Sequence, residues 1–369
     1  MLSLERLIPP RDQLEPLGLI SAVSPPLLLL TLLLSHPSRF LKSTILPLFI
    51  FSAIFTSLRY TTGSAADDYA RASLSFTFVL RAIDAFLLSK PSFELAFKRS
   101  KEEEVPTPWS MKRLGWALKW ITTMRGAGWE WQVIPKDSGG QNSLSRQQYL
   151  RRRLAKLCLT YLALDVTSTY MQSRPYFRRA VPLSSLPPTE SIFNMLAACA
   201  AAALALNTAY QLVCIVCVAS HIWHPDECVD LFGSLRDAKS LAGFWGKTWH
   251  QSFRRPFTSI PTFVVAKLCP SSPRSSLRPI LNIFGAFSLS ALVHAFSSFA
   301  MARTGSGSLR FFLVQPFGIV FETVVSHLCR NLQGIGWRRT KIMVGYVWTA
   351  SWLLWFWPWF FDEAVQVSN

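Results

Sequence analysis

The sequence predicts an all-α polytopic membrane protein with about seven to nine transmembrane helices. Half of the 369 residues are hydrophobic and only 16% are charged, which is too apolar for an ordinary water-soluble enzyme. Several apolar stretches reach the ~20 residues that a helix needs to cross a bilayer. The 38 lysines and arginines, against 21 acidic residues, lie mainly between those stretches, as in the loops of membrane proteins.

Seven stretches have the length and composition of spanning helices. In chain order they are 17–34, 43–58, 154–170, 191–219, 279–301, 309–328 and 342–361. The first has no small-residue cleavage site, so we interpret it as a span and not as a removed signal peptide. The last carries a tryptophan cluster, which suits the interface between headgroups and hydrocarbon. Asp67–Ser89 is amphipathic, and either an interfacial helix or a further span fits it.

The spacing of these stretches divides the chain into three parts. We expect N-terminal transmembrane helices in residues 1–60, an amphipathic and cytosolic segment in 61–153, and a larger membrane domain in 154–369. Polar stretches at 135–145 and 270–279 are expected to be loops. Seven crossings from a cytosolic N-terminus would place most basic clusters, Arg151–Arg153 among them, on the cytosolic side. Arg174, Arg178 and Arg179 would then be lumenal, against that rule.

The net charge of +17 does not indicate a nucleic-acid partner, because the cations are not gathered on one soluble surface. The seven cysteines are scattered through apolar segments and do not form a disulfide framework. Cys214 and Cys217 form a CxxC pair inside an apolar run, so we interpret them as core residues, with a redox or zinc role as the alternative.

Two of the six histidines are candidates for function. His294 lies inside the apolar run 287–299, where burying an imidazole is costly and an ionisable residue is a functional candidate. The alternative is a neutral histidine that hydrogen bonds between helices. His250 ends the tryptophan-rich segment 240–251, which is too polar to span and suits the membrane surface, where it is either functional or an interfacial anchor.

Metal binding is not predicted. His221 and His224 are three residues apart and are followed by acidic residues, which invites a metal site. Pro225 breaks a helix at that point and no second ligand cluster is evident, so a metal stays the weaker interpretation.

The remaining features favour a transfer reaction. No GxSxG elbow, Walker loop or HExxH is present, which removes the commonest hydrolase, ATPase and protease interpretations. A buried histidine, an interfacial histidine and cationic loops suit an anionic water-soluble donor and an apolar acceptor. A coenzyme A thioester has that donor chemistry, with phosphates for arginine and lysine and a carbonyl to be brought to membrane depth.

Four motifs carry a resemblance to a known family. They are Arg125–Trp131 (RGAGWEW), Asp230–Leu235 (DLFGSL), Phe244–Gln251 (FWGKTWHQ) and Ser288–His294 (SLSALVH). In this order they resemble the motifs of the wax synthase-like family of membrane-bound O-acyltransferases, whose fungal members include acetyltransferases of terpenoids and meroterpenoids. The resemblance covers roughly Trp109–Phe361, and the third motif is its most specific part.

The resemblance implies an acyl-CoA-dependent O-acyltransferase. The endoplasmic reticulum is the default location for a protein with such spans. Acetyl-CoA is the implied co-substrate, with no permanently bound cofactor and no metal, and a hydrophobic alcohol is the acceptor. His294 matches the general base and His250 a second polar position that holds Asn or His among relatives. Ala295 stands where many relatives have an acidic residue, so no neighbouring carboxylate orients the base.

The motifs also suggest substrate-binding residues. We predict them to be Arg125, Trp129, Trp131, Trp245, Lys247, Trp249 and Gln251. For the tryptophans, an interfacial anchoring role is the alternative. Two other functions stay open: a wax synthase that joins a long acyl chain to a fatty alcohol, and a membrane transporter or lipid-binding protein without chemistry.

Overall fold

The computed structural model describes residues 9–35, 38–88, 106–129, 131–132, 144–179, 181–269, 277–329 and 335–367. These residues are mostly helical, which confirms the all-α prediction. Their two strands, β1 (Glu15–Pro16) and β2 (Tyr60–Thr61), are two residues long and pair in parallel. Most of the loops expected at 135–145 and 270–279 lies outside the described residues, as does Glu130 of the first motif.

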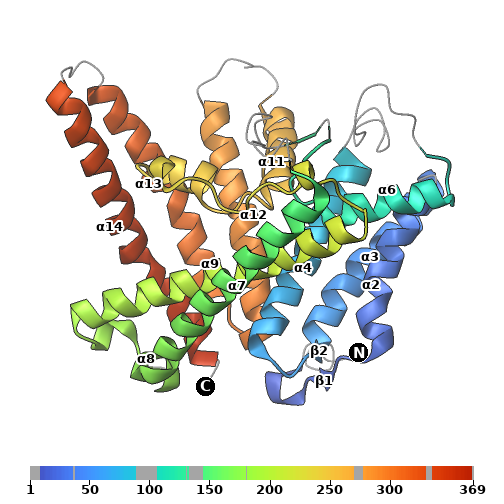
Figure 1. Cartoon of the computed structure of the whole chain (residues 1–369), viewed down its shortest axis with the longest axis horizontal. Helices are drawn as coiled ribbons and strands as arrows, with labels where there is room; N and C mark the ends of the chain where they lie inside the picture. Colours follow the sequence, from blue (N-terminus) through green and yellow to red (C-terminus); the bar gives the residue numbers. More distant parts are fainter. Residues whose placement is uncertain are drawn as a thin grey trace. The chain divides into compact units, whose positions relative to one another are not determined.

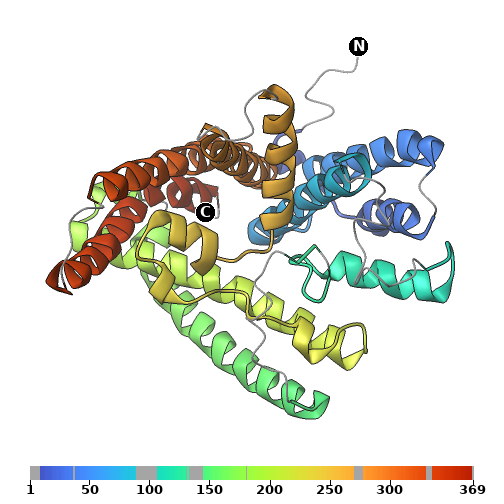
Figure 2. The same cartoon turned by 90° about the horizontal axis from the view of Figure 1, so that it is seen from above.

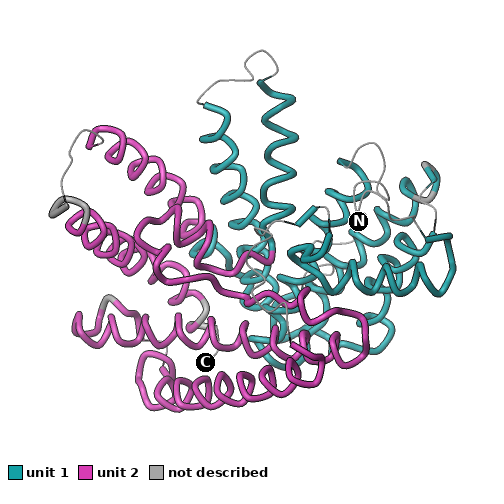
Figure 3. Tube along the Cα trace, turned by 45° about the horizontal axis from the view of Figure 1, so that its top comes forward, with its two compact units in different colours: residues 1–135, 253–309 teal, residues 136–252, 310–369 magenta. Residues whose placement is uncertain are grey.

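The chain forms two compact units, each built from two separated stretches (Figure 3). The first unit comprises residues 1–135 and 253–309, and the second comprises 136–252 and 310–369. The parts expected from sequence, 1–60, 61–153 and 154–369, therefore do not coincide with these units. His294 belongs to the first unit and His250 to the second.

The helices of the first unit are α2 (Leu19–Leu34), α3 (Arg39–Arg59), α4 (Ala65–Ile83) with its π-helical continuation η2 (Asp84–Leu88), α6 (Met111–Thr122), α11 (Arg254–Leu268) and α12 (Leu277–Ala302). α4 packs along α3 and along α12, and α11 packs on α12 (Figure 1). A Cβ atom at Gly285 would lie 2.7 Å from that of Pro261, so glycine permits the close approach of α11 and α12.

Buried arginines cap helix ends in the first unit. Arg113 donates from Nε to the carbonyl of Leu33, 2.7 Å away, at the end of α2. Arg81 donates to the carbonyls of Trp120 at 2.6 Å and Thr123 at 3.0 Å, at the end of α6. The last carbonyls of a helix have no partner within it, so these guanidinium groups supply the missing donors. Part of the basic excess is thus structural and buried.

The second unit contains α7 (Arg146–Ser173), α8 (Pro175–Arg179), α9 (Pro188–Ala219), α10 (Leu241–Gly243) with its π-helical continuation η7 (Phe244–Thr248), α14 (Ile335–Val367) and most of α13 (Ser306–Leu328). α7 and α9 run side by side (Figure 2). Ser145 and Gln148 form a capping box that starts α7.

Arg153 of α7 differs from its expected place among exposed cytosolic charges. It is 3% exposed and donates to the side chains of Tyr149 and Gln211, at 2.7 and 2.9 Å. It also donates to the Cys228 carbonyl at 2.6 Å and to Asp230 at 2.9 Å. A buried charge is stable only when it is paired in this way. Arg153 therefore ties the segment after α9 to α7.

Three helices of the described residues are long and apolar enough to cross a membrane: α9, α12 and α13. α2 is apolar but shorter, with 16 residues. The other stretches expected to span, 43–58, 154–170 and 342–361, are also helical, within α3, α7 and α14. The amphipathic stretch 67–89 forms α4 and η2 as far as Leu88. The structure thus supports a helical membrane protein without establishing seven to nine spans.

Candidate functional site

His294 lies on α12, where the helix faces α4. Its Nδ1 shares a hydrogen bond with the Tyr69 hydroxyl, and the two atoms are 2.5 Å apart. The two rings are 6.2 Å apart between centroids and inclined at 31°. The neighbouring Val293 is fully buried and the imidazole itself is half-buried. The predicted base therefore has a partner on another helix, which the sequence analysis did not identify.

Two ring contacts join α4 and α12 around His294. Tyr69 and Phe76 are seven residues apart, so they lie on one face of α4. Phe76 meets Phe296 of α12 with ring centroids 5.0 Å apart, as Tyr69 meets His294. These two ring contacts lie two turns apart on α4 but only two positions apart on α12, and together they join the two helices at the imidazole.

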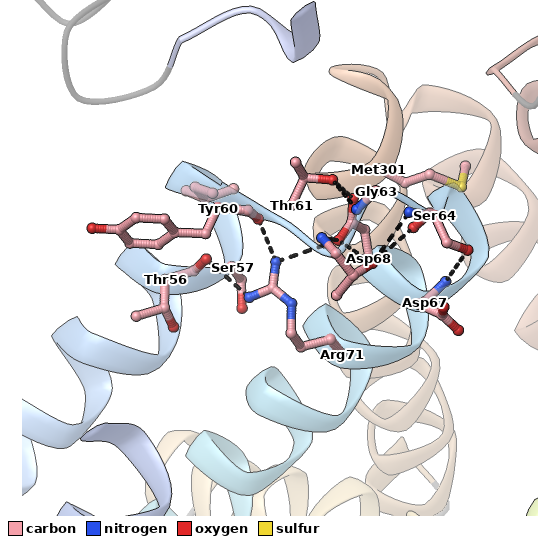
Figure 4. A network of polar contacts seen from close by, with 12 residues as sticks. Thr56, Ser57, Tyr60, Thr61, Gly63, Ser64, Asp67, Asp68, Arg71 and Met301 are labelled. Carbon is pink, nitrogen blue, oxygen red and sulfur yellow. Dashed lines mark hydrogen bonds and ion pairs between the residues drawn. The ribbon is translucent and has the colours of Figure 1, made fainter. Parts of the chain in front are cut away.

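Asp68, the residue before Tyr69, is the centre of a polar network at the start of α4 (Figure 4). It is 1% exposed and accepts hydrogen bonds from Thr61 Oγ1 at 2.6 Å, Thr62 N at 2.8 Å and Thr62 Oγ1 at 3.0 Å. Its carboxylate also lies 3.7 Å from the guanidinium groups of Arg11 and Arg71. This network fixes the first turn of α4, because a buried carboxylate must keep its donors.

Two arginines hold the end of α12, which lies beside the Asp68 network. Arg303 donates to the carbonyls of Pro9 at 2.9 Å and Leu58 at 2.7 Å, and Arg11 donates to the Met301 carbonyl. Burial, and then the positive charge of Arg11, lower the pKa of Arg303. The chain after α12 turns sharply. A Cβ at Gly305 would lie 2.6 Å from the carbonyl oxygen of Ala295, beside His294.

The Arg125–Trp131 motif forms a tight turn in the core of the first unit. Gly126 has a φ of +66°, and a Cβ there would lie 2.6 Å from the Trp131 ring. Trp129 and Trp131 are 3% and 6% exposed and pack in the core beside Trp116, and Arg125 is buried as well. These tryptophans are core residues in the structure, and their substrate contact stays a prediction.

The Phe244–Gln251 motif lies in the second unit, at the short helix made of α10 and η7. Glu322 of α13 accepts from the backbone N–H groups of Leu241 at 2.5 Å and Ala242 at 3.3 Å, and from Trp348 Nε1 at 2.9 Å. The first N–H groups of a helix need such an acceptor, and a carboxylate also complements the helix dipole. An acidic residue inside an apolar helix thus anchors the start of the motif.

Another polar residue of α13, which is fully buried, holds the first tryptophan of this motif. Gln315 is 0% exposed, and its Oε1 accepts from Nε1 of Trp245 and of Trp352, each at 3.2 Å. Gln251 closes the motif by donating to the carbonyls of Trp245 at 2.9 Å and Trp249 at 2.6 Å. The polar side chains of the motif are therefore used in part to hold its own irregular backbone.

His250 follows η7 and packs among aromatic rings. Its centroid is 5.5 Å from that of Trp249 and 6.2 Å from that of Phe232, which it meets edge-on at 81°. Lys247 is exposed, with Nζ 3.6 Å from a carboxylate oxygen of Asp237, so it is the predicted binding residue that meets solvent most directly. The second unit thus gathers His250, Trp245, Trp249, Lys247 and Gln251 in one segment.

The Asp230–Leu235 motif lies beside this segment. Gly233 N donates to the Thr248 carbonyl at 2.9 Å, which joins the two motifs. Burial alone would raise the pKa of Asp230, but the hydrogen bond from Lys156 and the charge of Arg153 lower it below its ordinary value. The motif therefore contacts α7 through Asp230 and the η7 segment through Gly233.

Within the described ranges, no group of three or more His, Cys, Asp or Glu side chains is arranged to hold a metal ion. His224 instead pairs with Asp226, with 3.0 Å between nitrogen and oxygen. Cys214 and Cys217 are buried with Cys228 and Tyr149 in one cluster, and the seven cysteines are unbridged. The core interpretation of the CxxC pair agrees with this burial.

Comparison with known proteins adds the family. Residues 228–314, which include both candidate histidines, match the Membrane bound O-acyl transferase family. The chain is 32% identical to the acetyltransferase ple2 of Rhodocybe pseudopiperita over 345 residues, which cover 91% of this chain and 89% of that protein. It is 31% identical to the acetyltransferase pyr8 of Aspergillus fumigatus over 281 residues, which cover 68% of this chain and 64% of that protein.

A relative with a different name is the O-Mevalon transferase macI of Penicillium terrestre, 27% identical over 325 residues, which cover 78% of this chain and 71% of that protein. No solved structure matches. The family consists of enzymes, so the transporter alternative is set aside. On the identity and coverage shared with ple2, the chain belongs to the membrane bound O-acyl transferase family, whose members transfer acyl groups to oxygen.

Proposed function

We propose that this O-acyltransferase moves an acetyl group from acetyl-CoA to a hydroxyl group of a hydrophobic small metabolite such as a terpenoid. The observation that supports this most is the His294 imidazole, which lies on the apolar helix α12 with Nδ1 engaged by Tyr69. The acetyl group is favoured because pyr8 and ple2, which are 31% and 32% identical to this chain, are named acetyltransferases.

In the proposed reaction His294 acts through Nε2 as the general base. The alcohol oxygen forms a bond to the acetyl carbonyl carbon while its proton passes to Nε2. The carbon–sulfur bond then breaks, and the departing CoA thiolate takes the proton from the imidazolium, which leaves an acetate ester and CoA-SH. A positioned base of this kind contributes about 10²–10⁴-fold to the rate.

The donor is proposed to bind through cations outside the apolar helices. Lys247 is exposed and beside the aromatic rings of η7, where it suits a phosphate of the donor. Trp245, Trp249 and His250 share that segment, and the predicted role of His250 is a hydrogen bond to charge that develops on the donor.

We further propose a multi-pass protein of the endoplasmic reticulum with about seven to nine spans. The apolar helices α9, α12 and α13 support a membrane setting. Epitope tags in the chain segments between helices, probed before and after membrane permeabilisation, test the number of crossings.

The direct test of the activity uses membranes that contain the full chain, radiolabelled acetyl-CoA and a panel of terpenoid alcohols. Labelled ester should form, and His294→Ala should lower its rate of formation by about 10²–10⁴-fold. Competition with palmitoyl-CoA separates acetyl transfer from the wax synthase alternative, because a long-chain enzyme would lose its label to palmitoyl product. Absence of any ester with every donor and alcohol would contradict the proposal.

A further inference from the structure

The Tyr69–His294 hydrogen bond raises the question of which atom holds the proton. If the phenol donates to Nδ1, the neutral imidazole carries its proton on Nε2 and cannot accept one there. If Nδ1 donates to the Tyr69 oxygen, Nε2 keeps the lone pair that a base needs. The 2.5 Å between the two atoms is compatible with either atom as the donor. The proposed reaction needs an unprotonated Nε2, and only the second arrangement provides it.

A phenol is suited to its surroundings in this place. Ala295, next to the histidine, offers no carboxylate, and a second buried charge beside an apolar helix is costly. The hydroxyl of Tyr69 is neutral, yet its oxygen accepts a hydrogen bond from Nδ1 both before and after the ring is protonated. It can therefore hold the ring without adding a negative charge.

The position of Tyr69 is itself fixed. It follows Asp68, whose buried carboxylate takes three hydrogen bonds from Thr61 and Thr62 (Figure 4). One face of α4 is aligned on α12 by the contact between Phe76 and Phe296. A side chain that orients a reacting group has to be held by its own neighbours. Along α4, Asp68 is fixed before Tyr69 and Phe76 is fixed after it.

We infer that Tyr69 is the positioning residue of the general base: its oxygen accepts the Nδ1 proton of His294 and so keeps Nε2 unprotonated and directed at the acceptor alcohol. This inference rests on the proposed function, since it assigns the tautomer that acyl transfer through His294 requires. Tyr69 makes no bond to substrate in this scheme and takes no proton from it.

The test is a double-mutant cycle between Tyr69→Phe and His294→Ala in the full-length protein in membranes. Phenylalanine keeps the ring that packs at this place and removes only the hydroxyl. The expected result is a fall in kcat of about ten- to a hundredfold for Tyr69→Phe, with KM within about twofold of wild type. In the His294→Ala background, Tyr69→Phe should change the residual rate by less than about twofold, because residues that act as a unit are not additive.

Tyr60→Phe is the matched control. Tyr60 contributes its carbonyl to Arg71, at 2.5 Å, and its backbone to β2, so loss of its hydroxyl should leave kcat unchanged. Detergent-solubilised Tyr69→Phe should melt within a few degrees of wild type.

Each outcome decides one point. Full activity of Tyr69→Phe together with an inactive His294→Ala overturns the positioning role and leaves the proposed base intact. A loss in Tyr69→Phe that persists in the His294→Ala background, or that comes with a raised KM or a large fall in melting temperature, indicates a structural role and also overturns it. Full activity of His294→Ala rejects the proposed function itself.

Discussion

The two candidate histidines are supported in opposite ways. His294 lies within a regular helix, and its ring shares a hydrogen bond with a side chain of a second regular helix. His250 lies on irregular backbone after a π-helical turn. Two polar residues of α13, Glu322 and Gln315, hold that segment by its N–H groups and by a tryptophan indole. The regular helix already fixes the backbone position of His294, so a partner is needed only to orient its ring. An irregular segment has to be held along its length.

This comparison predicts that changes near His294 act on turnover, whereas changes around His250 act first on stability. The largest effect is expected from His294→Ala. Loss of the base should lower kcat by about 10²–10⁴-fold with the protein still inserted and folded. Ester formation with labelled acetyl-CoA measures it, and His327→Ala, an exposed histidine at the end of α13, is the control. Near-normal turnover would remove His294 from the mechanism.

Glu322→Ala should have the next largest effect, and on stability. It leaves the N–H groups of Leu241 and Ala242 and the Trp348 indole without their acceptor, which costs about 3 kcal/mol or more. Thermal unfolding in detergent measures the loss. Thr323→Ala removes only a hydroxyl that bonds back to the Ile319 carbonyl and should be near wild type. Equal melting temperatures for the two variants would mean that Glu322 does not anchor the segment.

Gly126→Ala tests how tightly the Arg125–Trp131 turn is packed. The new Cβ would meet the Trp131 ring at 2.6 Å and force a side chain onto a φ of +66°, for a loss of about 2–4 kcal/mol. Gly63 also has a positive φ, +85°, but a Cβ there would meet nothing within 4 Å. Gly63→Ala should therefore lose only the stability that the strained backbone conformation costs. The difference between their unfolding free energies isolates the Trp131 contact, and no difference would contradict that packing.

The smallest effect concerns Asp230 and acid pH. Its pKa is lowered in the folded state, so its contribution to stability is present above the ordinary carboxylate range and is lost as the pH falls through the folded value. Wild type should lose thermal stability between about pH 5 and pH 3 more than Asp230→Asn does. Because Asp230 is half-exposed, the difference should be small, about 1 kcal/mol or less. Asp226→Asn, whose partner is the exposed His224, is the control.

Polar residues inside apolar runs were the main signal for candidate residues in the sequence. The runs themselves predicted helices, and His294 was found because an imidazole is unusual within one. Glu322 and Gln315 carry the same signal in α13, a polar group in an apolar run, but the sequence analysis did not single them out. Their partners are set by packing within the second unit, which one-dimensional periodicity does not contain.

The features that the sequence analysis did not identify depend on contacts between residues far apart in the chain or on burial. Tyr69 and His294 are 225 positions apart, and no local spacing links them, although the seven-residue interval to Phe76 marks the face of α4 that meets α12. Arg153 was counted with exposed loop charges because composition does not distinguish a solvated arginine from one that is buried and paired. Trp129 and Trp131 likewise suited an interface by residue type and lie in a core.

The sharp turn at Gly305 brings main chain close to the backbone of α12 beside His294. Since a Cβ at residue 305 would lie 2.6 Å from the carbonyl oxygen of Ala295, a side chain there would force one of the two backbone segments to move. If His294 accepts the alcohol proton as proposed, its Nδ1 edge, which Tyr69 occupies, is not the edge that the alcohol meets. The alcohol would then have to present its hydroxyl to the Nε2 edge, which favours a hydroxyl at a protruding corner of a bulky metabolite.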